Sequence, residues 1–246
     1  MAEPLAPLRR FTTARVALGR AGNALPTDAH LAFAEAHAMA RDAVHAALDV
    51  DALAAELASL GLPTMVVTSR APDRHTYLVR PDLGRALDAT AAARLIRCDP
   101  ALALVVADGL SATAVQRHAV PFLAEALPRL ARIGIAAGPA VIASQGRVAI
   151  GDAIGAALGA EAVAVLIGER PGLSAPDSLG LYLTWDPRPG RSDAERNCIS
   201  NIRPAGQPYA HAADTLAWLV GEMRRRRLTG VTLKDERPAA ALPAPA

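Results

Sequence analysis

Lysine, cysteine and aromatic residues are rare in this sequence. Lys234 is the only lysine, and it lies in the order Leu-Lys-Asp. The Walker A loop needs lysine between glycine and serine or threonine, so P-loop nucleotide chemistry is excluded. The two cysteines, Cys98 and Cys198, lie far apart, which fits neither a disulfide framework nor a paired-cysteine metal site. Alanine is abundant where aromatics are few, so we expect a core of small, closely packed side chains.

Strong charge and long apolar runs are also lacking. The formal net charge is only +2, which creates no field that would gather nucleic acid or an acidic membrane surface. No apolar run approaches the ~18 residues that a membrane helix needs. The first ten residues contain no apolar core of signal-peptide length. We therefore expect a cytoplasmic protein with no nucleic-acid partner and no membrane partner.

The common catalytic motifs are missing as well. No G-x-G-x-x-G follows a predicted strand, and no serine lies in a G-x-S-x-G elbow. Gly151, Gly155 and Gly159 are spaced by four within a helical segment, which indicates close helix packing. The six histidines are scattered without a third ligand nearby. We expect neither a catalytic residue nor a metal site in this chain.

The first hundred residues have mainly helical patterns. Apolar residues at helical spacing predict an amphipathic helix over 28–48, and a second helix begins near Asp51. A short extended segment is predicted over 64–69. A turn at 80–85 leads into a third helix that ends near residue 96. We therefore expect residues 1–98 to form a helical N-terminal domain.

Beyond residue 99, short apolar runs alternate with helical patterns. Strands are predicted over 102–107, 139–143, 162–167 and 181–185. Such alternation is typical of a parallel sheet with right-handed crossovers, in which ligands bind beyond the carboxyl ends of the strands. The fold class is therefore α/β, with a mainly helical N-terminal region followed by a Rossmann-like parallel-sheet domain over 99–236.

Other parts of this second half are predicted from single residues. Pro121 is expected to divide the helix that Ser111 caps into two pieces, because proline removes a backbone donor. Residues 197–204 are interpreted as a polar loop, and 211–227 as the last long helix. The Pro/Ala-rich tail over 237–246 is predicted to be disordered.

Two loops that follow predicted strands are candidates for a ligand site. Glu169 and Arg170 project from a Gly-Glu-Arg-Pro-Gly loop, which is either a ligand-binding turn or a rigid turn whose charges pair with neighbours. The loop Asp-Gly-Leu-Ser at 108–111 could hold a polar ligand or could be an ordinary turn with a helix cap. Cys198 in its polar segment is interpreted as a small buried apolar residue rather than a reactive thiol.

Six stretches together resemble the small (light) subunit of ethanolamine ammonia-lyase, and they follow in the order of that family between residues 8 and 235. Three of them carry candidate site residues. These are Gly-Arg-Val at 146–148, Gly-Glu-Arg-Pro-Gly-Leu at 168–173 and Cys-Ile-Ser-Asn-Ile at 198–202. The other three lie at 13–22, 77–85 and 107–111.

The resemblance implies a non-autonomous subunit of an adenosylcobalamin-dependent lyase that converts ethanolamine to acetaldehyde and ammonia. In that family a TIM-barrel large subunit holds the substrate and performs the chemistry. The small subunit closes over the cobalamin at the subunit interface of a higher-order hetero-oligomer. Its cofactor contacts fall on the residues that are Val148, Glu169 and Cys198 in this sequence. The alternative is a stand-alone Rossmann-like protein that binds a small molecule or a nucleotide.

The sequence also indicates how the cofactor would be bound. A base-off cobalamin module reads D-x-H-x-x-G, and the one D-x-H here, ending at His30, is followed by Phe33 instead of glycine. We therefore expect base-on adenosylcobalamin, as the resemblance also implies. The chain has almost no N-terminal extension of the kind associated with packaging in bacterial microcompartments. We therefore expect the protein in the cytoplasm, with a bacterial microcompartment as the alternative location.

Overall fold

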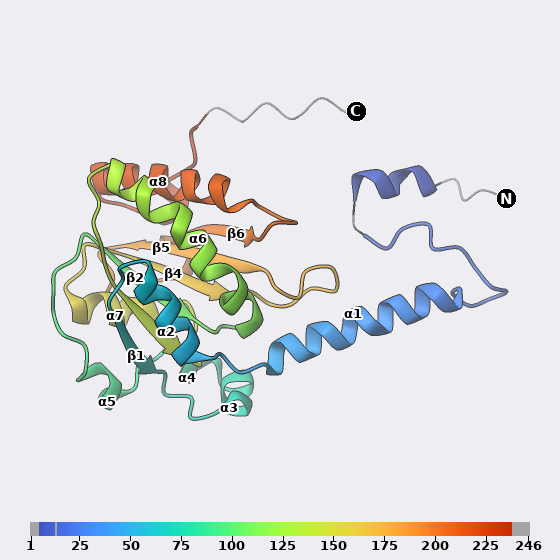
Figure 1. Cartoon of the computed structure of the whole chain (residues 1–246), viewed down its shortest axis with the longest axis horizontal. Coiled ribbons are helices and arrows are strands. Elements are labelled where there is room, and N and C mark those ends of the chain that lie inside the picture. The colour runs from blue at the N-terminus through green and yellow to red at the C-terminus, as the bar shows by residue number, and fades with distance from the viewer. Residues whose placement is uncertain (1–4, 13, 238–246) are drawn as a thin grey trace.

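The chain forms a mixed α/β fold around one six-stranded sheet, as seen in a computed structural model that describes residues 5–12 and 14–237 (Figure 1). The strand order is β1-β3-β2-β4-β5-β6. The strands are β1 (Thr64–Thr68), β2 (Leu102–Ala107), β3 (Ala137–Ser144), β4 (Ala162–Gly168), β5 (Leu179–Trp185) and β6 (Asn197–Ile202). The α/β fold class predicted from the sequence is confirmed.

Strand direction changes twice across the sheet, on either side of β5. The strands β1, β3, β2 and β4 are parallel, whereas β5 runs antiparallel to both β4 and β6. The predicted parallel sheet is therefore confirmed for β1, β2, β3 and β4, whereas the strand predicted over 181–185 runs antiparallel to both of its neighbours. The segment 169–178 between β4 and β5 contains no helix to carry the chain back across the sheet. The next strand therefore returns beside β4 in the opposite direction.

Residues 197–204, interpreted from the sequence as a polar loop, contain β6, so that interpretation is wrong. Only Ile199 and Ile202 of this strand are buried, and the remaining side chains are wholly or partly exposed. A strand at the edge of a sheet needs few apolar residues, because one long side faces away from its neighbours. Its sequence therefore has the composition of a loop.

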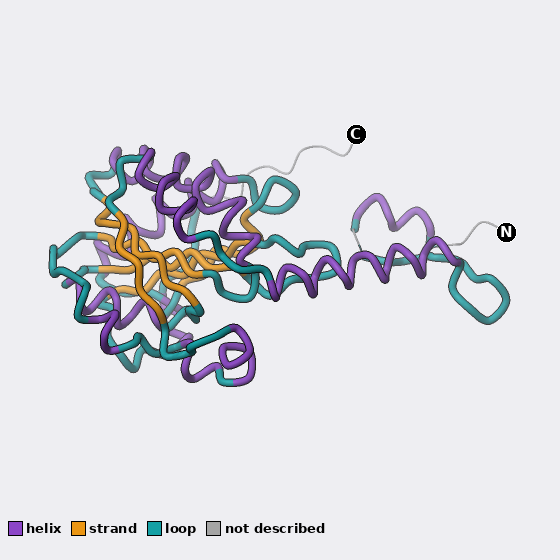
Figure 2. The backbone as a smooth tube through the Cα atoms, turned by 60° about the horizontal axis from the view of Figure 1, so that its bottom comes forward, coloured by secondary structure: helices purple, strands orange, loops and turns teal. Residues whose placement is uncertain are grey.

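Helices cover both faces of the sheet (Figure 2). One face packs against α2, α6 and α8, and the other packs against α7 and α5. The helices are α1 (Thr27–His45), α2 (Val50–Ser59), α3 (Arg74–Val79), α4 (Pro81–Gly84), α5 (Ala89–Ala92), α6 (Ala112–Arg132), α7 (Ile150–Leu158) and α8 (Tyr209–Arg226). Short 3-10 turns are η1 (Ala6–Phe11), η2 (Asp193–Glu195) and η3 (Gly230–Thr232).

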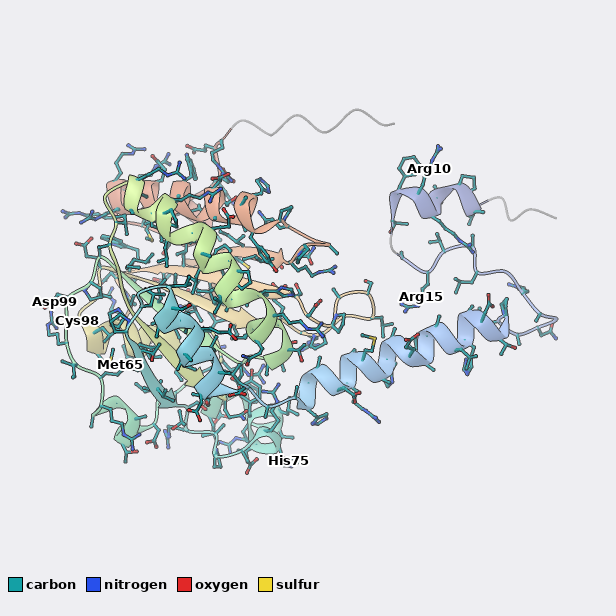
Figure 3. The ribbon with its side chains drawn as sticks, viewed as in Figure 1. Arg10, Arg15, Met65, His75, Cys98 and Asp99 are labelled. Atoms are coloured by element: carbon teal, nitrogen blue, oxygen red, sulfur yellow. The ribbon has the colours of Figure 1, made fainter. Side chains whose placement is uncertain are left out.

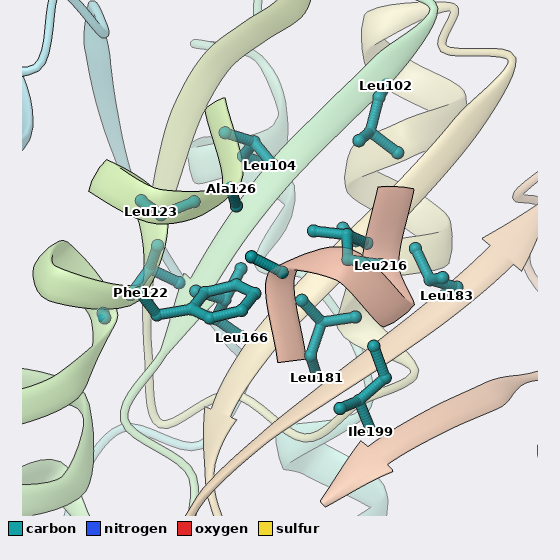
Figure 4. Close-up of a cluster of buried hydrophobic side chains, with 14 of the residues drawn as sticks. Leu102, Leu104, Phe122, Leu123, Ala126, Leu166, Leu181, Leu183, Ile199 and Leu216 are labelled. Carbon is teal, nitrogen blue, oxygen red and sulfur yellow. The ribbon is translucent and has the colours of Figure 1, made fainter. Parts of the chain in front are cut away.

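The alternation of side chains along β2 divides the core into two layers. Leu104 and its even-numbered neighbours face α6 and α8, whereas Val105 and its odd-numbered neighbours face α7. Phe122 of α6 and Leu216 of α8 both lie over the strands in the first layer (Figure 4). Each fully buried side chain of this size contributes about 1.5–3 kcal/mol.

The second layer is thin because α7 lies very close to the sheet. A Cβ atom added at Gly151 would be 2.3 Å from Val165 Cγ2, and one at Gly155 would be 2.5 Å from Pro187 Cγ. Gly159 ends the helix with a φ of +71°, a conformation that favours glycine. The predicted role in close helix packing is confirmed for Gly151 and Gly155, whereas Gly159 caps the helix.

Two helix predictions are wrong. The helix α6 continues through Pro121 as a single element of 21 residues instead of dividing there. Pro121 and Pro128 both lie on its exposed side, where water can replace the lost backbone bonds while the buried face keeps its packing. The helix expected after residue 85 is also interrupted. The chain there forms a bridge between Ser69 and Leu87 before α5 begins.

The first helix projects away from the sheet, and the segment before it folds back alongside, with Arg10 and Arg15 far from the core (Figures 1 and 3). Ala43 is the one buried residue of α1. Among the described residues, no helix is both long and apolar enough to cross a membrane. The division into two domains over 1–98 and 99–236 remains a proposal. The two parts share one sheet, because β1 from the first part pairs with β3 from the second. The tail predicted to be disordered lies outside the described residues, apart from Arg237.

Candidate functional site

An open pocket of about 430 Å³ lies where β2, β3 and β4 end. Its walls come from the loops that follow these strands and from the neighbouring faces of β5 and β6. This is the edge at which ligands bind in open α/β sheets. The lining residues are Tyr77, Leu110, Arg147, Val148, Ile167, Gly168, Glu169, Arg170, Tyr182 and Ser200.

Asp108 connects the ends of β2 and β3 beneath this pocket. Its buried carboxylate accepts backbone N–H bonds from Gly109 at 2.9 Å, Gln145 at 3.0 Å and Gly146 at 3.1 Å. These bonds position the turn that leads directly to Arg147 and Val148. Burial raises the pKa of Asp108, although the N–H donors and Arg74 oppose that shift.

The two candidate loops are in direct backbone contact. The Leu110 N–H donates to the Gly168 carbonyl at 2.9 Å, and a Cβ at Gly109 would lie 2.3 Å from that same oxygen. Gly109 also has a φ of +58°. This position therefore favours glycine both because of its backbone conformation and because a side chain would have no room. Ser111 accepts from the Ala114 N–H at 3.2 Å and donates to the Pro176 carbonyl at 2.9 Å. The predicted helix cap is confirmed, and Ser111 also holds the loop before β5.

The Glu169 side chain is held from several directions at the mouth of the pocket. Its carboxylate accepts hydrogen bonds from Ser200 Oγ at 2.6 Å, Ser178 Oγ at 2.5 Å and the Asn201 N–H at 3.1 Å. It lies across Gly180 of β5, where a Cβ would approach Glu169 Oε1 to 2.8 Å. The carboxylate is thus fixed by neutral donors. In the described part of the chain no arginine nitrogen lies within 4.0 Å of it.

Cys198 lies on β6 directly opposite Tyr182 of β5. Cys198 does not line the pocket. Its neighbours Tyr182, across the strand pair, and Ser200, two residues further along β6, both line it. Its side chain is exposed, so the interpretation as a buried apolar residue is wrong. Partial desolvation by its neighbours raises the pKa of the Cys198 thiol, and desolvation also raises the pKa of Tyr182.

The structure thus brings Val148 and Glu169 into one pocket and places Cys198 at its margin. Sequence reasoning missed several further members of the site, among them the following three residues. Ser178 and Ser200 hold Glu169, and Tyr77 forms part of the wall. Local patterns contain no signal for the two serines. Tyr77 begins one of the stretches on which the family resemblance was based.

The Tyr77 ring packs against two guanidinium groups. The Cζ atoms of Arg74 and Arg147 are 4.7 Å and 4.1 Å from its ring centre. Its hydroxyl donates to the Gly146 carbonyl at 3.3 Å, and burial raises its pKa to about 12. Tyr77 therefore acts as a neutral, buried support for Arg147 on one side of the pocket.

Residues 2–234 match the family model described as "Ethanolamine ammonia-lyase light chain (EutC)". The chain is 56% identical over 235 residues to a protein of Rhodopseudomonas palustris, covering 94% of this chain and 90% of that protein. It is 57% identical over 237 residues to one of Bradyrhizobium diazoefficiens, covering 95% and 91%. A protein of Azotobacter vinelandii is 56% identical over 245 residues, covering 97% and 91%. All three are named "Ethanolamine ammonia-lyase small subunit".

Proposed function

The chain belongs to the ethanolamine ammonia-lyase light-chain family, and from this we propose that it covers one side of adenosylcobalamin in a complex with the large subunit. The proposed reaction of that complex converts ethanolamine to acetaldehyde and ammonia. The proposed task of this chain is to bind and orient the cofactor and to exclude water, while the large subunit holds the substrate. The complex is proposed to be a higher-order hetero-oligomer in the cytoplasm or in a microcompartment.

The lining of the pocket fits the chemistry of a corrinoid. Leu110, Val148 and Ile167 supply apolar surface, and Glu169 and Ser200 supply polar groups at the same mouth. A corrin is a broad apolar ring whose edge carries neutral amide groups. Ligand pockets commonly combine an apolar wall with a few placed polar groups that set orientation.

Glu169 is suited to receive one of those amides. An ionised carboxylate offers about four acceptor positions, and three are taken by Ser200, Ser178 and Asn201. About one position is left for an amide N–H of the cofactor. Since the three donors already hold the carboxylate in place, little side-chain entropy would be lost on binding. Val148 would offer apolar contact, and Cys198 would contact the cofactor at the margin of the site.

The size of the pocket explains the need for a partner. A corrinoid with its nucleotide loop is larger than an open hollow of about 430 Å³ can enclose. This chain would therefore cover only part of the cofactor, and the large subunit would cover the rest. The chemistry that adenosylcobalamin supplies when bound is homolysis of its cobalt–carbon bond. We also propose base-on binding, since His30, the histidine of the D-x-H order, lies on α1 outside the pocket.

The observation that carries this proposal is that Val148 and Glu169, which follow different strands, line one pocket. The test is an absorbance titration of cobalamin against this chain alone, the large subunit alone and the reconstituted complex, with acetaldehyde formation measured in parallel. We expect tight binding and turnover only when both subunits are present. Equal affinity and turnover by the large subunit alone would refute the proposal. Tight nucleotide binding by this chain alone would favour the stand-alone alternative.

A further inference from the structure

Arg147 is anchored to the chain by one side of its guanidinium group. Its Nη2 donates to the Tyr77 carbonyl at 3.1 Å, and its Cζ stacks 4.1 Å from the Tyr77 ring centre. A Cβ at Gly84 would lie only 2.9 Å from Arg147 Cγ, so the stem of the side chain passes close over that glycine. The guanidinium is therefore held at the wall of the pocket and does not move freely in solvent.

This anchoring leaves most of its donors unused. Arginine has five N–H donors, and within the described chain Arg147 makes one side-chain hydrogen bond. Its Nε is buried and has no partner among residues 5–12 and 14–237. By contrast, Arg196 forms two bonds of 2.7 Å to Asp152. A buried donor without a partner costs free energy, which an incoming acceptor would recover.

The charges around the pocket favour a negatively charged acceptor. Arg147 and Arg170 both line it, and neither has a carboxylate within 4.0 Å in the part of the chain that the structure describes. The pocket's one carboxylate, Glu169, is already bound by neutral donors. Two arginines therefore face the hollow without a counter-ion. Arginine matches the oxygens of phosphate and carboxylate groups well.

We propose that Arg147, with Arg170 adding positive charge at the rim, binds the phosphodiester of the cobalamin nucleotide loop. This inference rests on the proposed function, because it assigns the same pocket to the same cofactor. The corrin side chains end in neutral amides, whereas the phosphodiester is the anionic group of the molecule. Glu169 would then receive an amide at the ring edge, and Arg147 would receive the phosphate of the loop.

Three corrinoids separate the phosphate from the rest of the cofactor. Cobalamin has the whole nucleotide loop, cobinamide phosphate keeps the phosphate without ribose and base, and cobinamide has neither. Each is titrated into the reconstituted complex with Arg147→Met, which keeps an apolar stem over Tyr77, and with Arg147→Lys, which keeps a charge. Arg132→Met at the end of α6 removes a charge far from the pocket and is the matched control. Gel filtration and circular dichroism establish that each complex assembles and folds.

We expect Arg147→Met to weaken binding of cobalamin and cobinamide phosphate by roughly 10- to 100-fold and to leave cobinamide unchanged. Arg147→Lys should restore part of the loss, and Arg132→Met should change nothing. Equal weakening for all three corrinoids would overturn the phosphate assignment. Loss of subunit assembly in the Arg147→Met variant would also overturn it, because Arg147 would then pair with a carboxylate of the large subunit. Neither result affects the proposed function, which fails only if the wild-type complex needs no small subunit to bind cobalamin.

Discussion

Ser200 on the edge strand β6 donates a hydrogen bond of 2.6 Å to the Glu169 carboxylate at the end of β4. These residues are 31 positions apart, and the whole of β5 lies between them in the sheet. The bond is possible because Gly180 of β5 has no side chain to block the path of Glu169. The edge strand therefore takes part in orienting the charged residue of the pocket, in addition to completing the sheet.

Replacing Glu169 by alanine should weaken cobalamin binding in the complex. The change removes the proposed acceptor of a corrin amide and leaves Ser178 and Ser200 without their common partner. Loss of a charged hydrogen-bond partner costs about 1.5–3 kcal/mol, or roughly 10- to 100-fold in Kd. The measurement is an absorbance titration of the reconstituted complex. Glu125→Ala on α6 removes the same charge at a distance and is the control. An unchanged Kd for Glu169→Ala would show that this carboxylate does not contact the cofactor.

Replacing Ser200 by alanine should have a smaller effect of the same sign. The carboxylate would keep its bonds to Ser178 and Asn201 but would lose its donor from β6. A hydrogen bond to a charged group contributes about 1.5–3 kcal/mol, part of which the remaining donors and water would replace. We therefore expect roughly a 3- to 10-fold increase in the Kd for cobalamin.

The matched control for that variant is Ser59→Ala on α2. The Ser59 hydroxyl donates at 2.6 Å to the Glu56 carbonyl in its own helix, far from the pocket. It should leave cobalamin affinity unchanged. If Ser200→Ala and Ser59→Ala gave the same Kd, the contact between Ser200 and Glu169 would have no role in orienting the carboxylate.

The Cys198 thiol should titrate at a higher pH than a free cysteine. Desolvation and the nearby Glu169 charge raise the pKa of the thiol, and together they outweigh the opposing hydrogen bond with Tyr182. A raised pKa means less reactive thiolate at any pH below it. In a Cys98→Ser background, the rate of iodoacetamide labelling should therefore rise with pH later than it does for glutathione. A midpoint at or below that of glutathione would show that the surroundings of Cys198 stabilise the thiolate instead.

Local sequence patterns predict the interior of this fold well. The run at 102–107 is buried on both faces, so every position in β2 must be apolar, and such a strand is visible without any knowledge of its neighbours. The glycines of α7 are visible for a similar reason, because close packing against Val165 and Pro187 requires small residues at a fixed spacing. In both cases one short segment contains the whole signal.

The site is harder to predict because its contacts join distant segments. The partners of Glu169 lie on β6 and on the loop before β5, and no spacing in the sequence connects them. The strand β6 itself was missed because an edge strand needs little apolar character. Glu169 was nevertheless a candidate from its loop after a predicted strand and from the family resemblance, whereas Val148 came from the resemblance alone. The propensity of Pro121 to end a helix was outweighed by the packing of Phe122 and its neighbours.

Replacing Asp152 by alanine should destabilise the chain strongly. Asp152 on α7 accepts two bonds of 2.7 Å from Arg196, and the side chains are only 3% and 2% exposed. Arg196 lies directly before β6, so this pair joins α7 to the start of the edge strand. Removing Asp152 takes away the closest carboxylate of a buried guanidinium, whose remaining carboxylate contact is Asp193 at 3.4 Å. Breaking a buried pair costs up to about 3–5 kcal/mol. Urea unfolding followed by circular dichroism measures the change.

The control for this prediction is an exposed ion pair of the same chemistry. Arg80 donates to Asp82 at 2.7 Å, but the Asp82 and Arg80 side chains are 61% and 58% exposed, so Asp82→Ala should change the stability very little. The double variant Asp152→Ala with Arg196→Met removes the stranded charge and should recover much of the lost stability. If Asp152→Ala and Asp82→Ala shifted the urea midpoint equally, the buried pair would not be what holds α7 to the start of β6. A stable Asp152→Ala variant with normal cobalamin affinity would also show that the Glu169 pocket does not depend on this junction.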